Sequence, residues 1–247
     1  MVAIIDNMLK ALETALGFLT VFKTRGGPTA DLAEVGRSAW TFPLVGALIG
    51  ALLVIAHLIF SAHFPLFVAA ILTVGLWIFL TGGLHLDGWT DCWDALAASV
   101  TPERRFIIMK DSRLGTFGAL ALILLLAVKV AALAREDLSV ATLFLAPVVG
   151  RGIMVLAAYG SRHRGEGMAA LFLSGLNPSA VRWAAIIGLV PTVIAGWTGI
   201  LAAAAAYVGA MWFRRFADSR LPAVNGDVLG AICEFSETLF LLIACAR

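Results

Sequence analysis

Residues 40–60 read WTFPLVGALIGALLVIAHLIF and contain no aspartate, glutamate, lysine or arginine. A helix of about 20 apolar residues crosses the roughly 30 Å of hydrocarbon in a bilayer. Because lipid offers the backbone no hydrogen-bonding partner, an apolar run of this length is expected to be helical. This stretch therefore predicts a membrane-spanning helix, and it decides the class of fold.

Similar apolar runs recur along the chain, at residues 65–80, 114–133 and 228–246. The composition agrees, because 61% of the residues are hydrophobic and 14% are charged, unlike an ordinary soluble domain. We predict an all-α, polytopic transmembrane helix bundle of about six to eight spans. The expected spans are 38–60, 65–82, 114–134, 139–159, 183–195, 197–213 and 228–246, with 183–195 either a half-helix or one arm of a hairpin.

The N-terminal segment, residues 1–22, has a different character. Asp6, Lys10 and Glu13 stand among apolar residues at helical spacing, without a basic leader or a small-residue cleavage site. This pattern is not that of a signal peptide. It predicts an amphipathic helix on the membrane surface or against the bundle. No linker or repeat divides the sequence, so residues 1–247 are expected to form one integral-membrane domain.

Basic residues concentrate in four of the expected loops. Loops that stay in the cytoplasm retain an excess of lysine and arginine. If residues 183–213 form a hairpin, all four loops lie on one face, which we assign to the cytoplasm together with the N-terminus. The lipid bilayer is the expected partner, and the net charge of +2 is too small to suggest nucleic acid. The four groups are Lys23, Arg25 and Arg37; Arg104, Arg105, Lys110 and Arg113; Arg162, Arg164 and Arg182; and Arg214, Arg215 and Arg220.

The densest functional pattern is TGGLHLDGWTDCWD at residues 81–94, where the second span is expected to meet the cytoplasm. Asp87, Asp91 and Asp94 are spaced i, i+4 and i+7, so on a helix they share one face and repel one another. Hard carboxylate ligands favour Mg²⁺, which also binds substrate phosphates. We predict these three residues as catalytic metal ligands. The alternative is a solvated helix start with Asp87 as its N-cap.

Other residues of the same segment are candidates for the site. Gly82, Gly83 and Gly88 leave room for a phosphate to approach the backbone, so Gly83 and Gly88 are predicted to bind substrate. His85 is a candidate catalytic base or phosphate contact. The alternative for His85 is a histidine satisfied at the membrane interface.

A second cluster, MKDSRLGTFG at residues 109–118, precedes the third span. Basic residues and glycines at a helix N-terminus bind phosphate, because the free N–H groups and the dipole both favour negative charge. We therefore predict Lys110, Asp111 and Arg113 as substrate-binding residues. The alternative is that the two cations only mark the cytoplasmic side.

A third cluster enters the last span. Asp227, Glu234 and Glu237 lie close to one helical stripe, since their offsets are seven and ten residues. Acids at membrane depth are functional candidates, with a metal or an intramembrane cation as partner. Asp227, Glu234 and Arg151 are predicted to bind substrate. Pairing of the glutamates with Lys129 or Arg151, the two cations expected at membrane depth, is the alternative.

By residue type alone, one membrane face gathers carboxylates, cations and glycine turns suited to Mg²⁺ and a polyphosphate. Phosphoryl transfer needs this set, because metal and basic side chains neutralise the transferring group while positioning does most of the catalysis. The residue types do not define the substrate.

The sequence also resembles the cobalamin synthase family, nearly end to end. Four strings carry the resemblance: residues 82–88 with Asp91 and Asp94, residues 109–116, Arg37 with residues 41–46, and residues 226–231 with Glu234 and Glu237. The first two strings together are highly specific.

The resemblance implies adenosylcobinamide-GDP ribazoletransferase activity. In that reaction α-ribazole, or its 5'-phosphate, attacks the phosphate attached to the corrinoid side chain of adenosylcobinamide-GDP, and GMP leaves. It also implies Mg²⁺, a place in the bacterial inner membrane, and metal ligation by the motif acids Asp87, Asp91 and Asp94. Arg37, from the third string, is predicted to contact substrate. Assembly as a homo-oligomer or with other enzymes of the pathway stays open.

Two alternatives differ in class. A CDP-alcohol phosphotransferase also uses clustered aspartates, but its pattern needs Ala-Arg two residues after Asp-Gly, and here Asp87-Gly88 is followed by Trp89-Thr90-Asp91-Cys92. A secondary transporter would be expected to show inverted repeats and acids near the membrane midplane in both halves. The main acidic cluster is instead expected at one face, which favours an enzyme.

Overall fold

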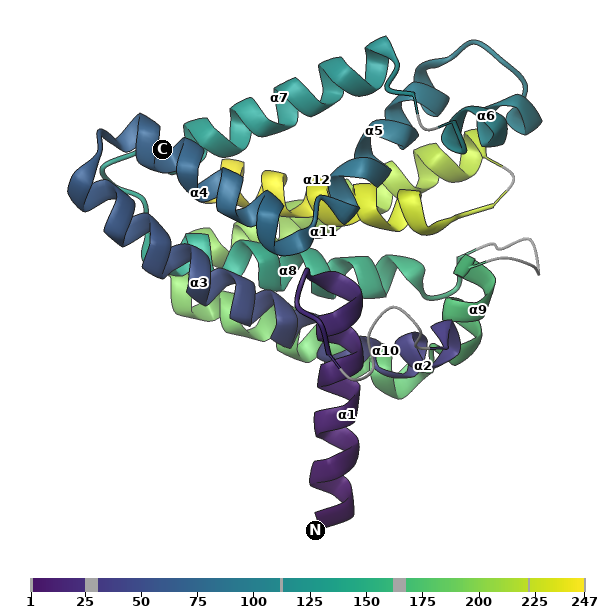
Figure 1. The fold of residues 1–247 in the computed structure, drawn as a ribbon, viewed down its shortest axis with the longest axis horizontal. Helices are drawn as coiled ribbons and strands as arrows, with labels where there is room; N and C mark the ends of the chain where they lie inside the picture. The colour runs from purple at the N-terminus through teal and green to yellow at the C-terminus, as the bar shows by residue number, and fades with distance from the viewer. Residues whose placement is uncertain (1, 25–30, 112, 162–167, 222, 247) are drawn as a thin grey trace.

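A computed structural model confirms the predicted all-α class. It describes residues 2–24, 31–111, 113–161, 168–221 and 223–246, and every regular element within these ranges is helical. Arg25, Ser112, Arg162 and Arg164, which belong to the predicted loops and clusters, lie outside the described residues. In chain order (Figure 1) the elements are α1 (Val2–Leu19), α2 (Leu32–Arg37), η1 (Ala39–Thr41), α3 (Phe42–His63), α4 (Leu66–Thr81), α5 (Leu84–Ala97), α6 (Pro102–Met109), α7 (Thr116–Leu133), α8 (Val140–Ala158), α9 (Met168–Gly175), α10 (Pro178–Leu189), η2 (Val190–Ala195), α11 (Gly196–Arg220) and α12 (Gly226–Ala244).

Helix α8 forms the centre of the bundle. In the apolar segment of α8, 78% of the residues are buried inside the bundle, whereas in that of α7 only 28% are. Helix α8 is therefore an interior helix and α7 a peripheral one. Gly46 and Gly50 bring α3 against α8, because a β-carbon at either position would collide with the carbonyl oxygen of Pro147 or Phe144. Small residues of this kind let membrane helices approach closely.

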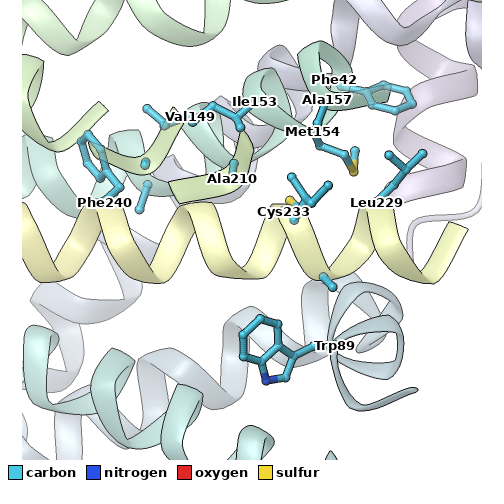
Figure 2. Packing of buried hydrophobic residues seen from close by; sticks show 14 of the residues in the cluster. Phe42, Trp89, Val149, Ile153, Met154, Ala157, Ala210, Leu229, Cys233 and Phe240 are labelled. Atoms are coloured by element: carbon cyan, nitrogen blue, oxygen red, sulfur yellow. The ribbon is translucent and has the colours of Figure 1, made fainter. Parts of the chain in front are cut away.

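Helix α12 lies between α8 and α5 (Figure 2). Ile153 and Met154 of α8 approach it from one side, and Trp89 of α5 from the other. Trp89 stacks on Phe235 of α12 with ring centroids 6.1 Å apart, and on Phe213 of α11 at 5.9 Å. Both faces of α12 are therefore covered by protein, which keeps its acidic residues away from lipid.

The outer surface is apolar, as expected of a protein in contact with lipid. Side chains such as Ile55, Phe67, Phe79, Ile123 and Leu124 are exposed. Four segments are long and apolar enough to cross a membrane: Ala39–His63, Thr116–Leu133, Val140–Ala158 and Pro178–Arg220. A fifth is added if α4 and α5, which are bent by 94° relative to each other, form one broken span.

The seven expected spans exceed this number for physical reasons. Helix α4 has only 16 residues, and α12 contains the three acids of the third cluster. The segment Pro178–Arg220 includes both arms of the expected hairpin.

That hairpin forms within Pro178–Arg220. A β-carbon on Gly188 of α10 would lie 2.8 Å from the Cα atom of Gly152 near the middle of α8. Arg214 of α11 donates to the carbonyl oxygens of Tyr159 and Gly160, just beyond the end of α8. Because α10 approaches the middle of α8 and α11 returns to its end, the two arms run in opposite directions (Figure 1). Helix η2 and Gly196, at a φ of 66°, make the turn.

Two of the basic loops, at residues 104–113 and 214–220, meet at one end of the bundle. Arg105 of α6 donates to the carbonyl oxygen of Arg220, where α11 ends, at 3.4 Å. The amide of Asn225, before α12, lies 3.9 Å from the sulfur of Met109, where α6 ends. At the opposite end, Arg135 lines a cavity with residues of η2, α11 and the C-terminal segment. We call the first of these the basic end.

Helix α1 extends away from the bundle at a steep angle (Figure 1). Its second half is anchored, since Ala15 and Leu19 are buried and the Val21 N–H donates to the carbonyl oxygen of Leu80 at 3.0 Å. Its first half exposes Ile5 and Leu9. A helix therefore occupies the N-terminal segment where the sequence predicts one, and its place at a membrane surface stays a prediction.

Candidate active site

The turn between α4 and α5 sets the direction of the acidic helix. Gly82 and Gly83 have φ values of 62° and 69°, in the left-handed region that favours glycine. No atom lies within 4 Å of a β-carbon built on Gly83, so the backbone conformation, and not crowding, explains this glycine. The turn bends the chain by 94° and directs α5 across α12.

Helices α5 and α12 cross at two glycines. A β-carbon on Gly88 would lie 2.7 Å from the carbonyl oxygen of Asp227, and one on Gly230 would lie 3.2 Å from the Cα atom of His85. The space beside Gly88 is thus occupied by the start of α12. This crossing brings Asp227 next to Asp87 and Asp91, from 140 residues away in the sequence.

Asp87, Asp91 and Asp227 form what we call the acid cluster. Helix α5, with 14 residues and these aspartates, is too short and too polar to cross a bilayer by itself. Burial raises the pKa of Asp91 to about 7, and the charges of Asp87, Asp227 and Asp94 add to the shift. Burial and the charge of Asp87 also raise the pKa of Asp227. The part of these shifts that comes from neighbouring charges shows that the carboxylates are close enough to repel each other, and a bound cation would relieve that repulsion.

Asn225 orients the third carboxylate of the cluster. Its side-chain oxygen accepts from the Val228 N–H at 3.1 Å and so caps α12, while its amide nitrogen donates to the Asp227 carboxylate at 2.6 Å. Asn225 was not among the predicted site residues. An asparagine directly before Gly-Asp at the start of a helix is the sequence pattern that could have identified it.

Asp94 is occupied differently from Asp87 and Asp91. Its two carboxylate oxygens accept from the backbone N–H groups of Gly115 and Gly118 at 2.7 and 2.8 Å. A β-carbon at either glycine would collide with this carboxylate. Asp94 therefore caps the first turn of α7 from a neighbouring helix. Its predicted role as a metal ligand stays a prediction.

The residues predicted to bind substrate phosphate, Lys110, Asp111 and Arg113, lie next to this cap. Lys110 ends α6 and is exposed, and Arg113 is exposed two residues before Gly115. The Arg113 guanidinium donates to the Asp111 carboxylate at 2.5 and 2.9 Å, and these hydrogen bonds lower the pKa of Asp111 to about 2. Through the contacts of Asp94, the loop that carries the two cations is held beside α5.

A cavity of about 220 Å³ adjoins the acid cluster. Its lining comes from α1, α2, α3, α5, α8, α9 and α12, and it is mainly aromatic and aliphatic. His85, Asp87 and Asp227 line it as well. We call this cavity the aromatic pocket, after Phe18, Phe42 and Phe172 in its wall.

A second set of charges lies inside the bundle. The Lys129 ammonium contacts the carboxylates of Glu234 and Glu237 at 2.6 and 2.8 Å, and Arg151 pairs with Glu237. All four side chains are buried. We call them the ion network. It is the pairing that the sequence left as an alternative for Glu234 and Arg151, and both residues are engaged there instead of reaching the acid cluster.

Arg37 is also placed away from the acid cluster. It lines a different cavity, of about 640 Å³, with Trp40 and Trp183, and its guanidinium lies 3.9 Å from the Asp31 carboxylate. The structure thus brings together His85, Gly83, Gly88, the acid cluster, Asp94 and the Lys110–Arg113 loop. It does not bring Arg37 or Glu234 to them, whereas Arg151, which pairs with Glu237, lies close enough to His85 for their charges to interact.

The residues present suit a hard metal ion that needs few ligands from the protein. Within the part of the chain that the structure describes, no group of three or more His, Cys, Asp or Glu side chains is arranged to enclose a metal ion. Mg²⁺ needs no such enclosure, because it is usually held by one or two carboxylates, water and substrate phosphates. The acid cluster, with its mutually repelling carboxylates, fits that ion.

Comparison with known proteins decides the family. A family model described as cobalamin-5-phosphate synthase matches residues 11–245. The chain belongs to this family. The match favours the family over the CDP-alcohol phosphotransferase and transporter alternatives, because it covers nearly the whole chain.

Individual relatives agree with this assignment. The chain is 38% identical to an adenosylcobinamide-GDP ribazoletransferase of Klebsiella pneumoniae (strain 342), over 95% of this chain and 99% of the relative. It is 38% identical to one of Brevibacillus brevis over 84% of this chain and 86% of the relative, and 34% identical to one of Acetivibrio thermocellus over 95% and 97%. No solved structure matches the chain significantly.

Proposed function

We propose that this cobalamin synthase family member is a Mg²⁺-dependent adenosylcobinamide-GDP ribazoletransferase. It joins α-ribazole, or its 5'-phosphate, to adenosylcobinamide-GDP and releases GMP. The observation that supports this most directly is the convergence of Asp87, Asp91 and Asp227 beside the aromatic pocket, in a chain matched by the family over residues 11–245. The reaction belongs to cobalamin biosynthesis, as the names of the relatives indicate.

The reaction transfers a substituted phosphate. A ribose hydroxyl oxygen of the acceptor forms a bond to the phosphorus that bears the corrinoid side chain. The bond from that phosphorus to the bridging oxygen of the diphosphate breaks, and GMP leaves with this oxygen. The hydroxyl proton passes to a base, for which Asp227 and His85, both lining the pocket, are the candidates.

The chain supplies charge on both sides of the diphosphate. Asp87 and Asp91, with Asp227 beside them, would hold Mg²⁺, whereas the oxygens of Asp94 already accept two hydrogen bonds from α7. When bound, the ion would neutralise the charge of the diphosphate. Lys110 and Arg113 are exposed on the adjacent loop, where they can contact the oxygens of the leaving GMP.

We place this site at the cytoplasmic face of a bacterial inner membrane. The acid cluster lies with the start of α12, at the basic end of the bundle. Loops rich in lysine and arginine are retained on the cytoplasmic side. A cytoplasmic site would also give direct access to the soluble, charged substrates.

The test is GMP release by the protein in nanodiscs, from adenosylcobinamide-GDP and α-ribazole, with and without Mg²⁺. We expect Mg²⁺-dependent release, and a loss of about a hundredfold or more in kcat for Asp91→Asn. Asp137→Asn is the matched control, because Asp137 pairs with Arg135 at the opposite end of the bundle. Absence of release by folded wild-type protein, with both substrates present, would overturn the proposed function.

A further inference from the structure

The wall of the aromatic pocket contains a ladder of three rings from three different helices. Phe42 of α3 stacks on Phe18 of α1, with centroids 6.2 Å apart and ring planes 24° from parallel. Phe42 also stacks on Phe172 of α9, with centroids 6.1 Å apart and ring planes 22° from parallel. Phe42 and Phe172 are buried, whereas Phe18 is 38% exposed at the outer end of the ladder. The three rings thus make this wall of the pocket aromatic and apolar.

Polar groups enter the pocket from α5 and the start of α12. His85 is 3% exposed, and its Nδ1 atom has no hydrogen-bonding partner among the described residues. Asp87 and Asp227 line the pocket and belong to the acid cluster. A buried ring nitrogen without a partner is costly, so a polar atom of a ligand is the natural complement. The pocket is therefore apolar along the three rings and polar where His85, Asp87 and Asp227 line it.

We propose that the aromatic pocket binds the base of the acceptor nucleoside, an inference that rests on the proposed function. A bicyclic aromatic base of benzimidazole type is flat and largely hydrocarbon, as the ladder requires. Stacking of a base on an aromatic side chain contributes roughly 1–3 kcal/mol. With the base in the pocket, the ribose lies towards His85 and Asp227, and its hydroxyl group is presented to the acid cluster.

The other parts of the two substrates fit this cavity less well. A corrin ring is far larger than a cavity of about 220 Å³, which is below the roughly 300–1,000 Å³ of pockets that hold whole drug-sized ligands. Guanine carries hydrogen-bonding groups around most of its edge, and each buried without a partner costs about 1–3 kcal/mol. The phenylalanine, leucine, methionine and alanine side chains of the wall supply no such partners, and among the described residues the polar lining side chains are limited to His85 and Asp87 of α5 and Asp227 of α12. The acceptor base is the fragment that matches both size and polarity.

Two substitutions test the pocket, by steady-state kinetics of GMP release in nanodiscs. Phe18→Leu shortens the ladder at its exposed end, and we expect the KM for α-ribazole to rise about fivefold to tenfold. Ala169→Phe places a bulky ring in the pocket wall and should raise the same KM further. The KM for adenosylcobinamide-GDP should not change in either variant. Phe22→Leu is the matched control, since Phe22 is 40% exposed and does not line the pocket.

Free benzimidazole provides a second readout. It should inhibit competitively with respect to α-ribazole but not with respect to adenosylcobinamide-GDP, and Phe18→Leu should weaken the inhibition. An unchanged KM for α-ribazole in both pocket variants would overturn the pocket assignment while leaving the proposed function in place. A rise confined to the KM for adenosylcobinamide-GDP, with weaker inhibition by GMP, would assign the pocket to guanine instead. An inactive wild-type protein would overturn the proposed function itself.

Discussion

Helix α12 carries carboxylates of two kinds, in the ion network and in the acid cluster. Glu234 and Glu237 are buried and paired with Lys129 and Arg151. Asp227 lies beside other carboxylates, and among the described residues no ion pair joins Asp87, Asp91 or Asp227 to a basic side chain. The charges of the ion network neutralise one another and so stabilise the fold. The carboxylates of the acid cluster repel one another, and a cation bound from outside would relieve this repulsion.

Neutralising one side chain should therefore lower the stability of the protein in the ion network and raise it in the acid cluster. Removing one partner of a buried ion pair leaves an uncompensated charge and costs about 3–5 kcal/mol. Removing one of several repelling carboxylates takes away an unfavourable interaction. Stability and activity should consequently separate between the two regions.

The largest effect is expected from Glu237→Gln. This carboxylate contacts Lys129 and also pairs with Nη1 of Arg151, whose Nε and Nη2 atoms have no hydrogen-bonding partner among the described residues. We expect a loss of about 3–5 kcal/mol, seen as a lower unfolding temperature and a lower yield of folded protein in detergent. Glu234→Gln should cost less, because Lys129 keeps its contact with Glu237. A Glu237→Gln variant as stable as the wild type would contradict the role of the ion network.

A smaller loss is expected from Asp94→Ala. The change removes two N–H acceptors at the start of α7, and loss of a helix cap costs about 0.5–2 kcal/mol. If the role of Asp94 is to hold α7, the Mg²⁺ concentration for half-maximal activity should stay close to that of the wild type. An Asp94→Ala variant that is as stable as the wild type but needs a much higher Mg²⁺ concentration for half-maximal activity would assign Asp94 to the metal site instead.

Asp91→Asn should stabilise the metal-free protein while it abolishes activity. The pKa of Asp91 is raised from 3.8 to about 7, so between these values the folded state binds more protons than the unfolded state. Stability contributed by this group is thus present at low pH and is lost as the pH rises through about 7. Because Asp91 is partly exposed, we expect less than about 1 kcal/mol from the change.

The measurement for Asp91 is thermal unfolding in EDTA, from acidic to mildly alkaline pH. The wild type should lose stability as the pH rises, Asp91→Asn should flatten that slope, and Mg²⁺ should restore stability to the wild type alone. A wild-type stability that increases over the same range would contradict the repulsion within the acid cluster.

The smallest effect on stability is expected from Arg113→Ala. The side chain is exposed, and among the described residues its ion-pair partner is the half-buried Asp111, so the free energy of unfolding should change by less than about 0.5 kcal/mol. If Arg113 contacts the leaving phosphate, the KM for adenosylcobinamide-GDP should rise by about threefold to tenfold. Arg104→Ala, an exposed change on neighbouring α6, is the control and should leave that KM unchanged.

The local features of this protein could be predicted from the sequence, because they depend on neighbouring residues. Uninterrupted apolar runs indicate helices in lipid, and Gly82-Gly83 indicates the turn before α5. The i, i+4 and i+7 spacing places Asp87, Asp91 and Asp94 on one face of one helix. The basic loops also predict which ends of the spans lie together, since that inference needs only the order of spans and loops.

Only the tertiary structure decided how these parts are used. Asp227 joins the acid cluster because Gly88 and Gly230 let α12 approach α5, and Asp94 is drawn to α7 by the free N–H groups of Gly115 and Gly118. Phe18 and Phe172 occupy ordinary apolar positions in their own helices, and Phe42, although it lies in the string of residues 41–46, has no local feature that assigns it to a pocket. Contacts between distant segments depend on the shape of the packed bundle, and a one-dimensional pattern of charge and hydropathy does not contain that shape.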